Sequence, residues 1–444
     1  MVAPRTPRVL GLRLADGIGK GNMWALLTLA FFSTLAITFL PATQAYILTT
    51  VLGVPREQHG TIVGSLGVAA EIAMLVSLLW YGALADRIGR RPIVLAGFTL
   101  LALGALLFPW AGNTWVLHAL RVVFAFGVAA LNTMLSTIAV DYVRDRWRGR
   151  SYGITGLFGG VGAIVATMVV VKLPRMFEAQ GMEPVTAARV AFAIVGVGIA
   201  LVGVILWFSL SPKRISETAA RTPLTSLIAA GVRQGRDPGV ALAYAASFVA
   251  RADLAVVAGF LSLWVINHGT HAGGLSGAEA LARAGAVVGI AYSMGLIASP
   301  VFGWLGDRMK RQNVVILAQL VSAGAYLSTL FISDPLGSGM FVVAVLVGIG
   351  EIAAITTIGP LLAQQVPADV RGTAYGVQTL CGAAGILIVS GLGGWLYDVW
   401  RPAAPFILVG LMGLAVACFG LVVRRRVVPS PLPPAEDEAA AVRA

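Results

Sequence analysis

Five ionisable residues lie inside long apolar runs of this 444-residue sequence, and they are its candidate chemical groups. They are Glu71, Arg121, Arg251, Asp253 and Glu351. A charge at the centre of a bilayer costs at least ~2.5 kcal/mol on insertion scales unless it is paired or hydrated, so each is a functional candidate. Three acids cannot all pair with two bases, and the carboxyl group left without a partner could bind and release a proton. We therefore predict that Glu351 or Asp253 carries a proton.

A structural role is the alternative for the same residues, because a buried acid–base pair also fixes the packing of two helices. Arg251 and Asp253 are two positions apart, and residues at that spacing on a helix do not face each other. We therefore expect their partners on other helices.

The sequence lacks the local motifs of other chemistries. It has no glycine-rich phosphate loop, no nucleophile elbow and no paired-histidine metal motif, so we expect no enzyme activity, no cofactor and no ATP-driven pumping. His268 and His271 have no acid or cysteine beside them, and we expect no metal there. Cys381 and Cys418 lie in apolar runs without CxxC spacing and are expected to be free thiols.

The composition is that of an integral membrane protein. Hydrophobic residues make up 58% of the chain and charged residues 12%, against about a quarter in soluble proteins. A bilayer-spanning helix needs about 20 apolar residues, and twelve runs meet this requirement. The runs are 23–48, 61–81, 93–111, 115–140, 152–173, 188–210, 240–266, 284–305, 313–332, 340–363, 375–396 and 404–423.

The basic residues predict the orientation. Alternating the twelve runs across the membrane places 24 of the 32 Lys and Arg on one side, 6 on the other and 2 within spans, so both termini are expected in the cytoplasm, with the chain in the plasma (inner) membrane. The net charge of +12 thus sets topology and does not indicate nucleic acid. The expected divisions are an N-terminal segment at 1–22, a six-helix bundle at 23–211, a central cytoplasmic loop at 212–238, a second bundle at 239–426 and a disordered tail at 427–444.

Two short turns carry a repeated signature. The first runs from Gly82 to Pro92 and reads GALADRIGRRP. A weaker copy begins at Gly303, 221 residues later, and reads GWLGDRMKR. A second matched pair, at 148–153 and 371–376, has an offset of 223 residues, and each member precedes the fifth span of its half. These pairs predict two halves of six helices in the same orientation.

This arrangement resembles the major facilitator superfamily. The first turn matches its loop signature, G-x-L-a-D-r-x-G-r-[KR], at every position, whereas Lys310 replaces the second glycine in the second turn. The resemblance implies twelve transmembrane helices in two pseudo-symmetric six-helix bundles, with alternating access by rocking of the halves. It also implies a cytoplasmic latch between the bundles. The residues matched to the latch are Gly82, Asp86, Arg87, Gly89, Arg90, Arg91, Gly303, Asp307, Arg308 and Arg311; for the arginines, service as topology anchors is the alternative.

The resemblance further implies that spans one, four, seven and ten line the central cavity and that span two is peripheral. Four of the five buried charges fall on the lining set, and Glu71 falls on span two. Candidate substrate contacts are Gln44, Asn132, Phe39 and Tyr46. Arg121 is followed by small residues, as in the span-four motif of proton-coupled drug antiporters, although Phe124 departs from that motif.

We therefore expect a monomeric secondary transporter of a small organic molecule. Proton-coupled export of amphipathic or cationic compounds is the first expectation, because three acids lie among apolar walls. Uptake of an organic anion is the alternative, with Arg121 and Arg251 as a carboxylate clamp. A polytopic enzyme would need a polar catalytic cluster, and a non-transporting sensor would tolerate a damaged signature turn; the sequence shows neither feature.

Overall fold

The computed structural model describes residues 8–144, 147–212, 224–367 and 370–427. The description excludes the side chains at 78, 79, 82, 83, 86, 224–228, 254 and 258. The tail expected to be disordered therefore lies, from residue 428 on, outside the described residues, and so does most of the first part of the central loop.

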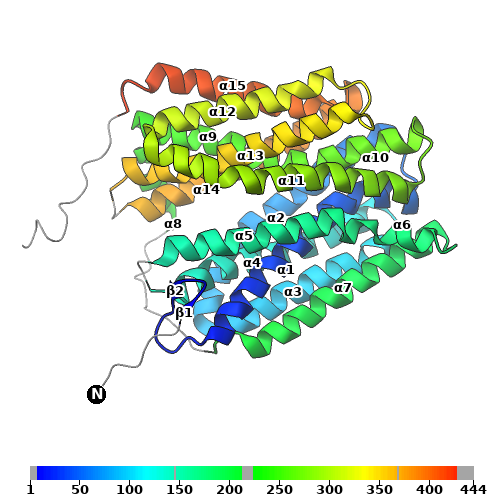
Figure 1. Ribbon diagram of the computed structural model, residues 1–444, viewed down its shortest axis with the longest axis horizontal. Coiled ribbons are helices and arrows are strands. Elements are labelled where there is room, and N and C mark those ends of the chain that lie inside the picture. Colours follow the sequence, from blue (N-terminus) through cyan, green and yellow to red (C-terminus); the bar gives the residue numbers. More distant parts are fainter. Residues whose placement is uncertain (1–7, 145–146, 213–223, 368–369, 428–444) are drawn as a thin grey trace, which may run out of the picture.

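Two groups of helices, one from each half of the chain, make up the described protein (Figure 1). The first half contains α1 (Lys20–Tyr46), η1 (Ile47–Val51), η2 (Arg56–Gln58), α2 (His59–Ile88), α3 (Arg90–Leu107), η3 (Phe108–Trp110), α4 (Thr114–Asp141), α5 (Arg148–Met168), η5 (Val170–Lys172), α6 (Leu173–Glu178) and α7 (Pro184–Ser209). The second half contains α8 (Leu224–Gln234), α9 (Pro238–Ala255), η6 (Val256–Leu261), α10 (Ser262–His271), α11 (Gly277–Arg308), α12 (Arg311–Leu327), η7 (Ser328–Phe331), α13 (Ser338–Gln365), α14 (Arg371–Val399) and α15 (Ala404–Val423).

The predicted fold class is confirmed. Within the described residues, 11 helical segments are long and apolar enough to cross a membrane. The twelfth span of the fold is the run α9, η6 and α10, in which a π-helical segment joins two α-helices. Large apolar side chains face outward, for example Trp80, Phe208 and Phe331, which are 72%, 75% and 86% exposed. In a lipid bilayer such a surface does not face water, so these exposed apolar side chains are not destabilising.

Local capping signals start several helices. Asp237 accepts hydrogen bonds from the backbone nitrogens of Gly239 and Val240 at 2.8 and 3.0 Å, ahead of Pro238 in the first turn of α9. Glu183 caps α7 in the same way, and the hydrogen bond from the Thr186 hydroxyl (2.9 Å) holds the pKa of this carboxyl group below its usual value.

The two halves repeat each other in packing as well as in sequence. α1 packs on α5 as α9 packs on α14, and α3 packs on α4 and α7 as α12 packs on α13 and α15. The matched tyrosines make the same contact, because the Tyr152 hydroxyl donates to the carbonyl of Ser136 (3.1 Å) and the Tyr375 hydroxyl donates to the carbonyl of Gly359 (2.9 Å). The tyrosines and the acceptors are each 223 residues apart. The repeat is therefore structural.

The halves touch mainly along two helix pairs, α2 with α14 and α5 with α11, and α1 also contacts α10, η6 and α11. We call the end with the signature turns, α8 and the first described residues the basic end; α6 and α10 lie at the opposite end (Figure 1). Close contacts between the halves lie toward this opposite end. A Cβ atom at Gly64 would collide with the carbonyl of Ser390, and one at Gly285 with the carbonyl of Thr167. Glycine therefore allows the two halves to close there.

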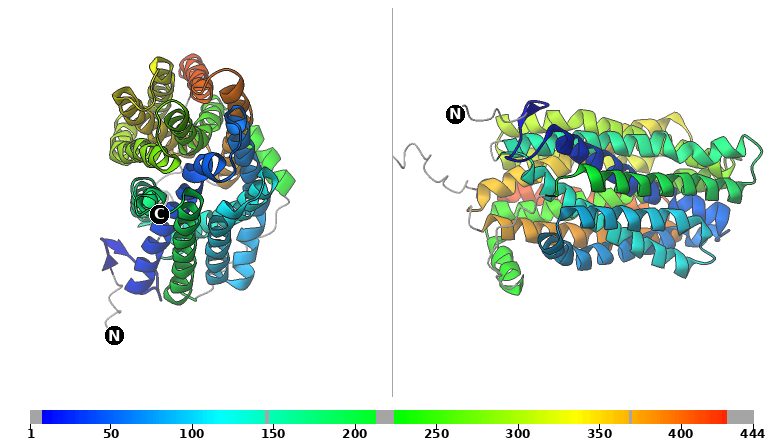
Figure 2. Two further views of the ribbon diagram at one scale, coloured as in Figure 1. Left: turned by 90° about the vertical axis from the view of Figure 1, so that its right-hand side faces the viewer. Right: turned by 90° about the horizontal axis from the view of Figure 1, so that it is seen from below.

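Two elements near the basic end are absent from the sequence prediction. The expected loop at 212–238 contains α8, which lies beside the bundle (Figure 2) and packs on the start of α14. The segment before α1 forms a short hairpin, Arg8–Val9 with Leu12–Arg13. After the hairpin, the backbone nitrogen of Ala15 donates a hydrogen bond to the carbonyl of Tyr142 (3.0 Å). Helix α8 and the hairpin are both too short for their amino-acid composition to distinguish them from a loop.

Candidate functional site

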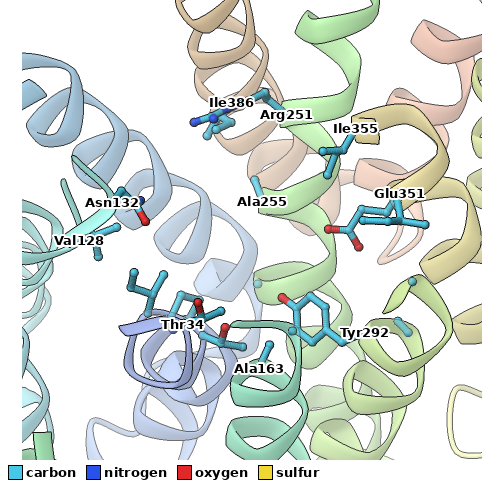
Figure 3. Close-up of a pocket in the computed structure, with 18 of the residues that line it drawn as sticks. Thr34, Val128, Asn132, Ala163, Arg251, Ala255, Tyr292, Glu351, Ile355 and Ile386 are labelled. Carbon is cyan, nitrogen blue, oxygen red and sulfur yellow. The ribbon is translucent and has the colours of Figure 1, made fainter. Parts of the chain in front are cut away.

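A cavity of about 920 Å³ lies between the two halves (Figure 3). Side chains from α1, α2, α4 and α5 form its wall in the first half, and side chains from α9, η6, α11, α13 and α14 form it in the second. It reaches toward the basic end as far as Tyr152, which is 46% exposed. The cavity is thus closed off by the helix contacts at the opposite end and continues toward the basic end.

Four of the five buried charges line this cavity. They are Glu71, Arg121, Arg251 and Glu351. Asp253 is fully buried and is not part of the wall. The expectation that the second span is peripheral is therefore wrong for Glu71, because α2 packs against both α4 and α14 and presents this face to the space between the halves.

Glu71 and Arg251 attract each other across the two halves. In the described structure they form no direct ion pair, and the Glu71 Oε2 and Arg251 Nε atoms have no hydrogen-bond partner. The stem of Arg251 packs against Gly382, where a Cβ atom would collide with the arginine Cγ. The position of Arg251 thus depends on α14, while its electrostatic partner is on α2.

Glu351 and Asp253 belong to one buried polar cluster inside the second half. The two carboxyl groups interact electrostatically. Asp253 accepts a hydrogen bond from the Ser322 hydroxyl at 3.4 Å through Oδ2, whereas its Oδ1 has no partner among the described residues. Tyr326 interacts with both acids, and Tyr292 interacts with Glu351 on the cavity wall. Figure 3 shows the Glu351 carboxyl group and the Tyr292 hydroxyl both pointing into the cavity.

Sequence reasoning missed Tyr292, Tyr326 and Ser322. The Tyr326 hydroxyl is fully buried without a hydrogen-bond partner in the described structure. Buried polar groups normally have partners, so the unpaired Tyr326 hydroxyl is an unusual feature of this buried cluster. The sequence signal would have been a hydroxyl-bearing residue in an apolar span, which is too common to single out these three.

Arg121 lies on the opposite wall, in the first half. Its guanidinium group is 5.7 Å from the centre of the Phe124 ring, and its Nε atom has no hydrogen-bond partner among the described residues. Gln44 and Asn132 also line the cavity. The two walls thus differ, with Arg121 and amides on one side and the Glu351 cluster on the other.

Phe39 and Tyr46 do not line the cavity in this conformation, so the prediction that they are cavity-lining residues is wrong for it. The Phe39 ring packs 4.9 Å from the Phe192 ring in the core of the first half. The Tyr46 hydroxyl lies 3.5 Å from both Glu178 Oε1 and the Pro184 carbonyl. The two residues are seven apart, or two helical turns, so they share a face of α1. That face points away from the cavity-lining one.

Four arginines of the two signature turns make contacts that the structure describes, three of them with a neighbouring helix or its end and one within its own helix. Arg90 pairs with Asp141 of α4 at 2.6 Å, and Arg91 donates to the carbonyl of Leu210 at the end of α7. In the second turn, Arg308 stacks over Trp304 at 4.2 Å, and Arg311 donates to the carbonyl of Pro360 at 2.5 Å. These contacts lie within one half of the molecule, so in this conformation they do not join the halves.

The remaining latch positions are partly described. The side-chain positions of Gly82 and Asp86 lie outside the described residues, and Arg87, Gly303 and Asp307 are exposed. Gly89 has φ of +96°, which favours glycine, whereas Lys310 at the matching place has φ of −58°. The second turn therefore accommodates lysine because its backbone follows another path.

The described part of the chain contains no group of three or more His, Cys, Asp and Glu side chains that could hold a metal ion. The expectation that no acid lies near His268 is wrong, because its Nε2 atom lies 3.3 Å from Asp334 Oδ1, a residue 66 positions away in the sequence.

The sequence and the fold both match known transporters. The Major Facilitator Superfamily model matches residues 25–271 and 243–444. The magnetosome protein MamH of Paramagnetospirillum magneticum is 28% identical, over 90% of this chain and 92% of that protein. The chain spans 58% of the length of magnetosome protein MamZ from the same organism, with 26% identity.

One further relative is named as a transporter and another as a multidrug resistance protein. A gentisate transporter of Corynebacterium glutamicum is 25% identical, over 80% of this chain and 77% of that protein. The multidrug resistance protein MdtH of Proteus mirabilis is 25% identical, over 80% of this chain and 85% of that protein. Among solved structures, the nucleoside transporter NupG has a TM-score of 0.72 at 14% identity, covering 90% of this chain and 99% of that one, which shows a shared fold.

Proposed function

Because this chain belongs to the major facilitator superfamily of transporters, we propose that it moves a small organic molecule across the membrane by alternating access coupled to protons. The observation that carries the proposal is the cavity between the halves, which has buried charge on both walls. The cavity is closed at one end and continues toward the other, and one state of an alternating-access cycle requires this arrangement.

We propose that the basic end faces the cytoplasm of a cell with this protein in its plasma membrane. The distribution of Lys and Arg, 24 against 6, supports this orientation. The conformation described here is then inward-facing. The halves, placed at 23–211 and 239–426, would act as rigid bodies in a monomer, and the arginines of the signature turns would meet across the halves only after rocking.

The proton site is proposed at Glu351, with Asp253 as its neighbour. Two buried carboxyl groups repel each other when both are ionised, and neither has a basic partner described. A proton held between them removes this repulsion. Glu351 lines the cavity and can exchange the proton with water there, while Asp253 is enclosed.

Arg121 favours a substrate with an anionic group. Glu71 is matched by Arg251, and Glu351 is assigned to the proton, so Arg121 is left as the charge to be matched within the cavity. Most of the wall is apolar, which suits an amphipathic or aromatic body. Proton-coupled uptake of an organic anion is therefore the better supported substrate class, and the gentisate transporter is consistent with it.

Export of a cationic amphipath remains the second candidate. The acids Glu71 and Glu351 line a cavity that also has many apolar side chains, and one relative is a multidrug resistance protein. This candidate loses part of its basis because Asp253, the third acid counted from the sequence, is not on the wall.

Transport by purified protein in liposomes tests both candidates. A pH gradient is imposed, and the uptake of labelled aromatic carboxylates is compared with that of lipophilic cations. We expect the carboxylates to accumulate and Arg121→Gln to reduce this at least tenfold, with Gln44→Ala as a cavity variant that removes no charge. Accumulation of the cations alone would favour export, and gradient-independent behaviour of every compound would contradict proton coupling.

A further inference from the structure

A second, smaller cavity lies between the halves at the end opposite the basic end. Its volume is about 460 Å³. Lys172 of η5 and Arg175 of α6 line it from the first half, and Arg283 of α11 lines it from the second. Figure 1 shows α6 and the start of α11 at this end of the molecule. The cavity is separate from the central one and shares none of its described lining residues.

The concentration of positive charge here is unusual for this side of the protein. The sequence places only six Lys and Arg on this side, and three of them line this one cavity. Among the described lining residues Glu279 is the single acid, and its Oε2 atom accepts a hydrogen bond from the backbone nitrogen of Ser276 at 3.0 Å. The described lining residues therefore carry a net charge of +2.

The three cations differ in how they are held. Arg283 donates to the carbonyl of Leu336 at 2.6 Å and lies 4.5 Å over the Phe341 ring, so its guanidinium fork is fixed. Lys172 and Arg175 are exposed, and no hydrogen bond or ion pair to another described residue engages them. One fixed fork with two free cations is suited to an oxyanion, because arginine binds phosphate oxygens in a bidentate manner and lysine binds them as a point charge.

Closure of the halves brings these like charges together. Beside the cavity, α5 and α11 are in direct contact, since a Cβ atom at Gly285 would collide with the Thr167 carbonyl and one at Gly289 with Met168. Lys172 and Arg175 belong to one half and Arg283 to the other, so their mutual repulsion opposes this contact. An anion between them would turn the repulsion into attraction on both sides.

We propose that this cavity binds a phosphate-type oxyanion, which bridges the halves and stabilises the conformation closed at this end. Two sources supply the same chemistry, free phosphate in solution and the phosphate of an anionic lipid headgroup. The site is independent of the transported substrate. A ligand that binds only the closed conformation favours it by mass action.

Binding to the full-length purified protein tests the site in two arms. In the first arm, the protein is held in phosphatidylcholine nanodiscs, and inorganic phosphate is titrated by calorimetry. In the second arm, the nanodiscs contain phosphatidylglycerol, and protein-bound lipid is measured by native mass spectrometry. The variant is Lys172→Gln with Arg175→Gln, because both side chains are exposed and without described partners. Arg56→Gln is the control, since Arg56 is an exposed arginine at the same end outside the cavity.

We expect saturable binding in one arm that is at least tenfold weaker in the double variant and unchanged in the control. The arm that shows it identifies the source. Bound anion should also raise the melting temperature of the wild type but not of the variant. Absence of binding in both arms, or an equal loss in the Arg56→Gln control, would overturn the proposal. Neither assay measures transport, so failure here leaves the proposed function untouched.

Discussion

Asp398 and Gly60 join the two halves at the end opposite the basic end, although they are 338 residues apart. The Asp398 carboxylate accepts hydrogen bonds from the backbone nitrogens of Gly60 (2.7 Å) and Thr61 (2.6 Å). A carboxylate at the last turn of α14 thus caps the first turn of α2. Such a cap satisfies free N–H groups and favours the helix dipole. It must break when this end opens.

Asp398→Asn should weaken closure at this end. The amide keeps one acceptor for the two N–H groups and loses the charge, and a negative charge at a helix N-terminus contributes about 0.3–1 kcal/mol, or up to roughly fivefold in a conformational equilibrium. Distances between spin labels across the two halves would report the shift. Asp334→Asn is the matched control, because Asp334 accepts from the Leu336 nitrogen (2.8 Å) within one half. An equal shift in both variants would contradict a specific role for Asp398.

Gly64→Ala should prevent the halves from closing. The added methyl group would collide with the Ser390 carbonyl, and the backbone of α14 has no flexible end to move aside. We expect at least a tenfold loss of transport with normal amounts of protein in the membrane. Gly198→Ala provides the comparison, since a Cβ atom at that glycine meets nothing within 4 Å. Wild-type transport by Gly64→Ala would show that this contact is not required.

Glu351→Gln should separate transport from the proton gradient. The amide cannot release a proton, so substrate should still equilibrate downhill but accumulate at least tenfold less under an imposed gradient. Asp253→Asn should reduce accumulation as well, because the two acids interact. Ser299→Ala, which alters a polar but uncharged position on the same cavity, is the control. Undiminished proton coupling in both acid variants would end the hypothesis.

Glu71 and Arg251 should show coupled effects. Glu71→Gln leaves Arg251 without its attractive partner in the cavity, and Arg251→Gln does the converse. The double variant should lose less stability than the two single losses added together, with a coupling energy of about 0.5–3 kcal/mol. Denaturation of the four purified proteins completes the cycle. Simple additivity would indicate that the two charges act independently.

The Arg90–Asp141 pair should contribute far more to stability than the nearby Arg144–Asp16 pair. Side chains of the first pair are 9% and 14% exposed, against 47% and 84% for the second. Removing one partner of a buried pair costs about 3 kcal/mol or more, whereas an exposed pair contributes less than about 1 kcal/mol. Denaturation of Arg90→Gln and Arg144→Gln should show this difference. Equal losses would mean that exposure does not govern these pairs.

The amino-acid sequence by itself determined the number of spans, the two-fold repeat and the family. Each of these depends on composition along the chain, since a span is a length of apolar residues and the repeat is an offset between identical residue types. The signature turn from Gly82 to Pro92 needed no tertiary information, because its glycines, aspartate and arginines are adjacent in the chain.

Only the tertiary structure decided which side chains share the cavity. Phe39 and Gln44 lie on the same helix, yet Phe39 packs in the core and Gln44 lines the cavity. The sequence suggested a cavity-lining Asp253 and a peripheral Glu71, whereas Glu71 lines the cavity and Asp253 is buried away from it. In a soluble helix the polar face reveals the orientation. In lipid both the outer and the packed faces are apolar, so the pattern does not show which face points inward. That choice is made by contacts between helices distant in sequence, such as Gly64 with Ser390.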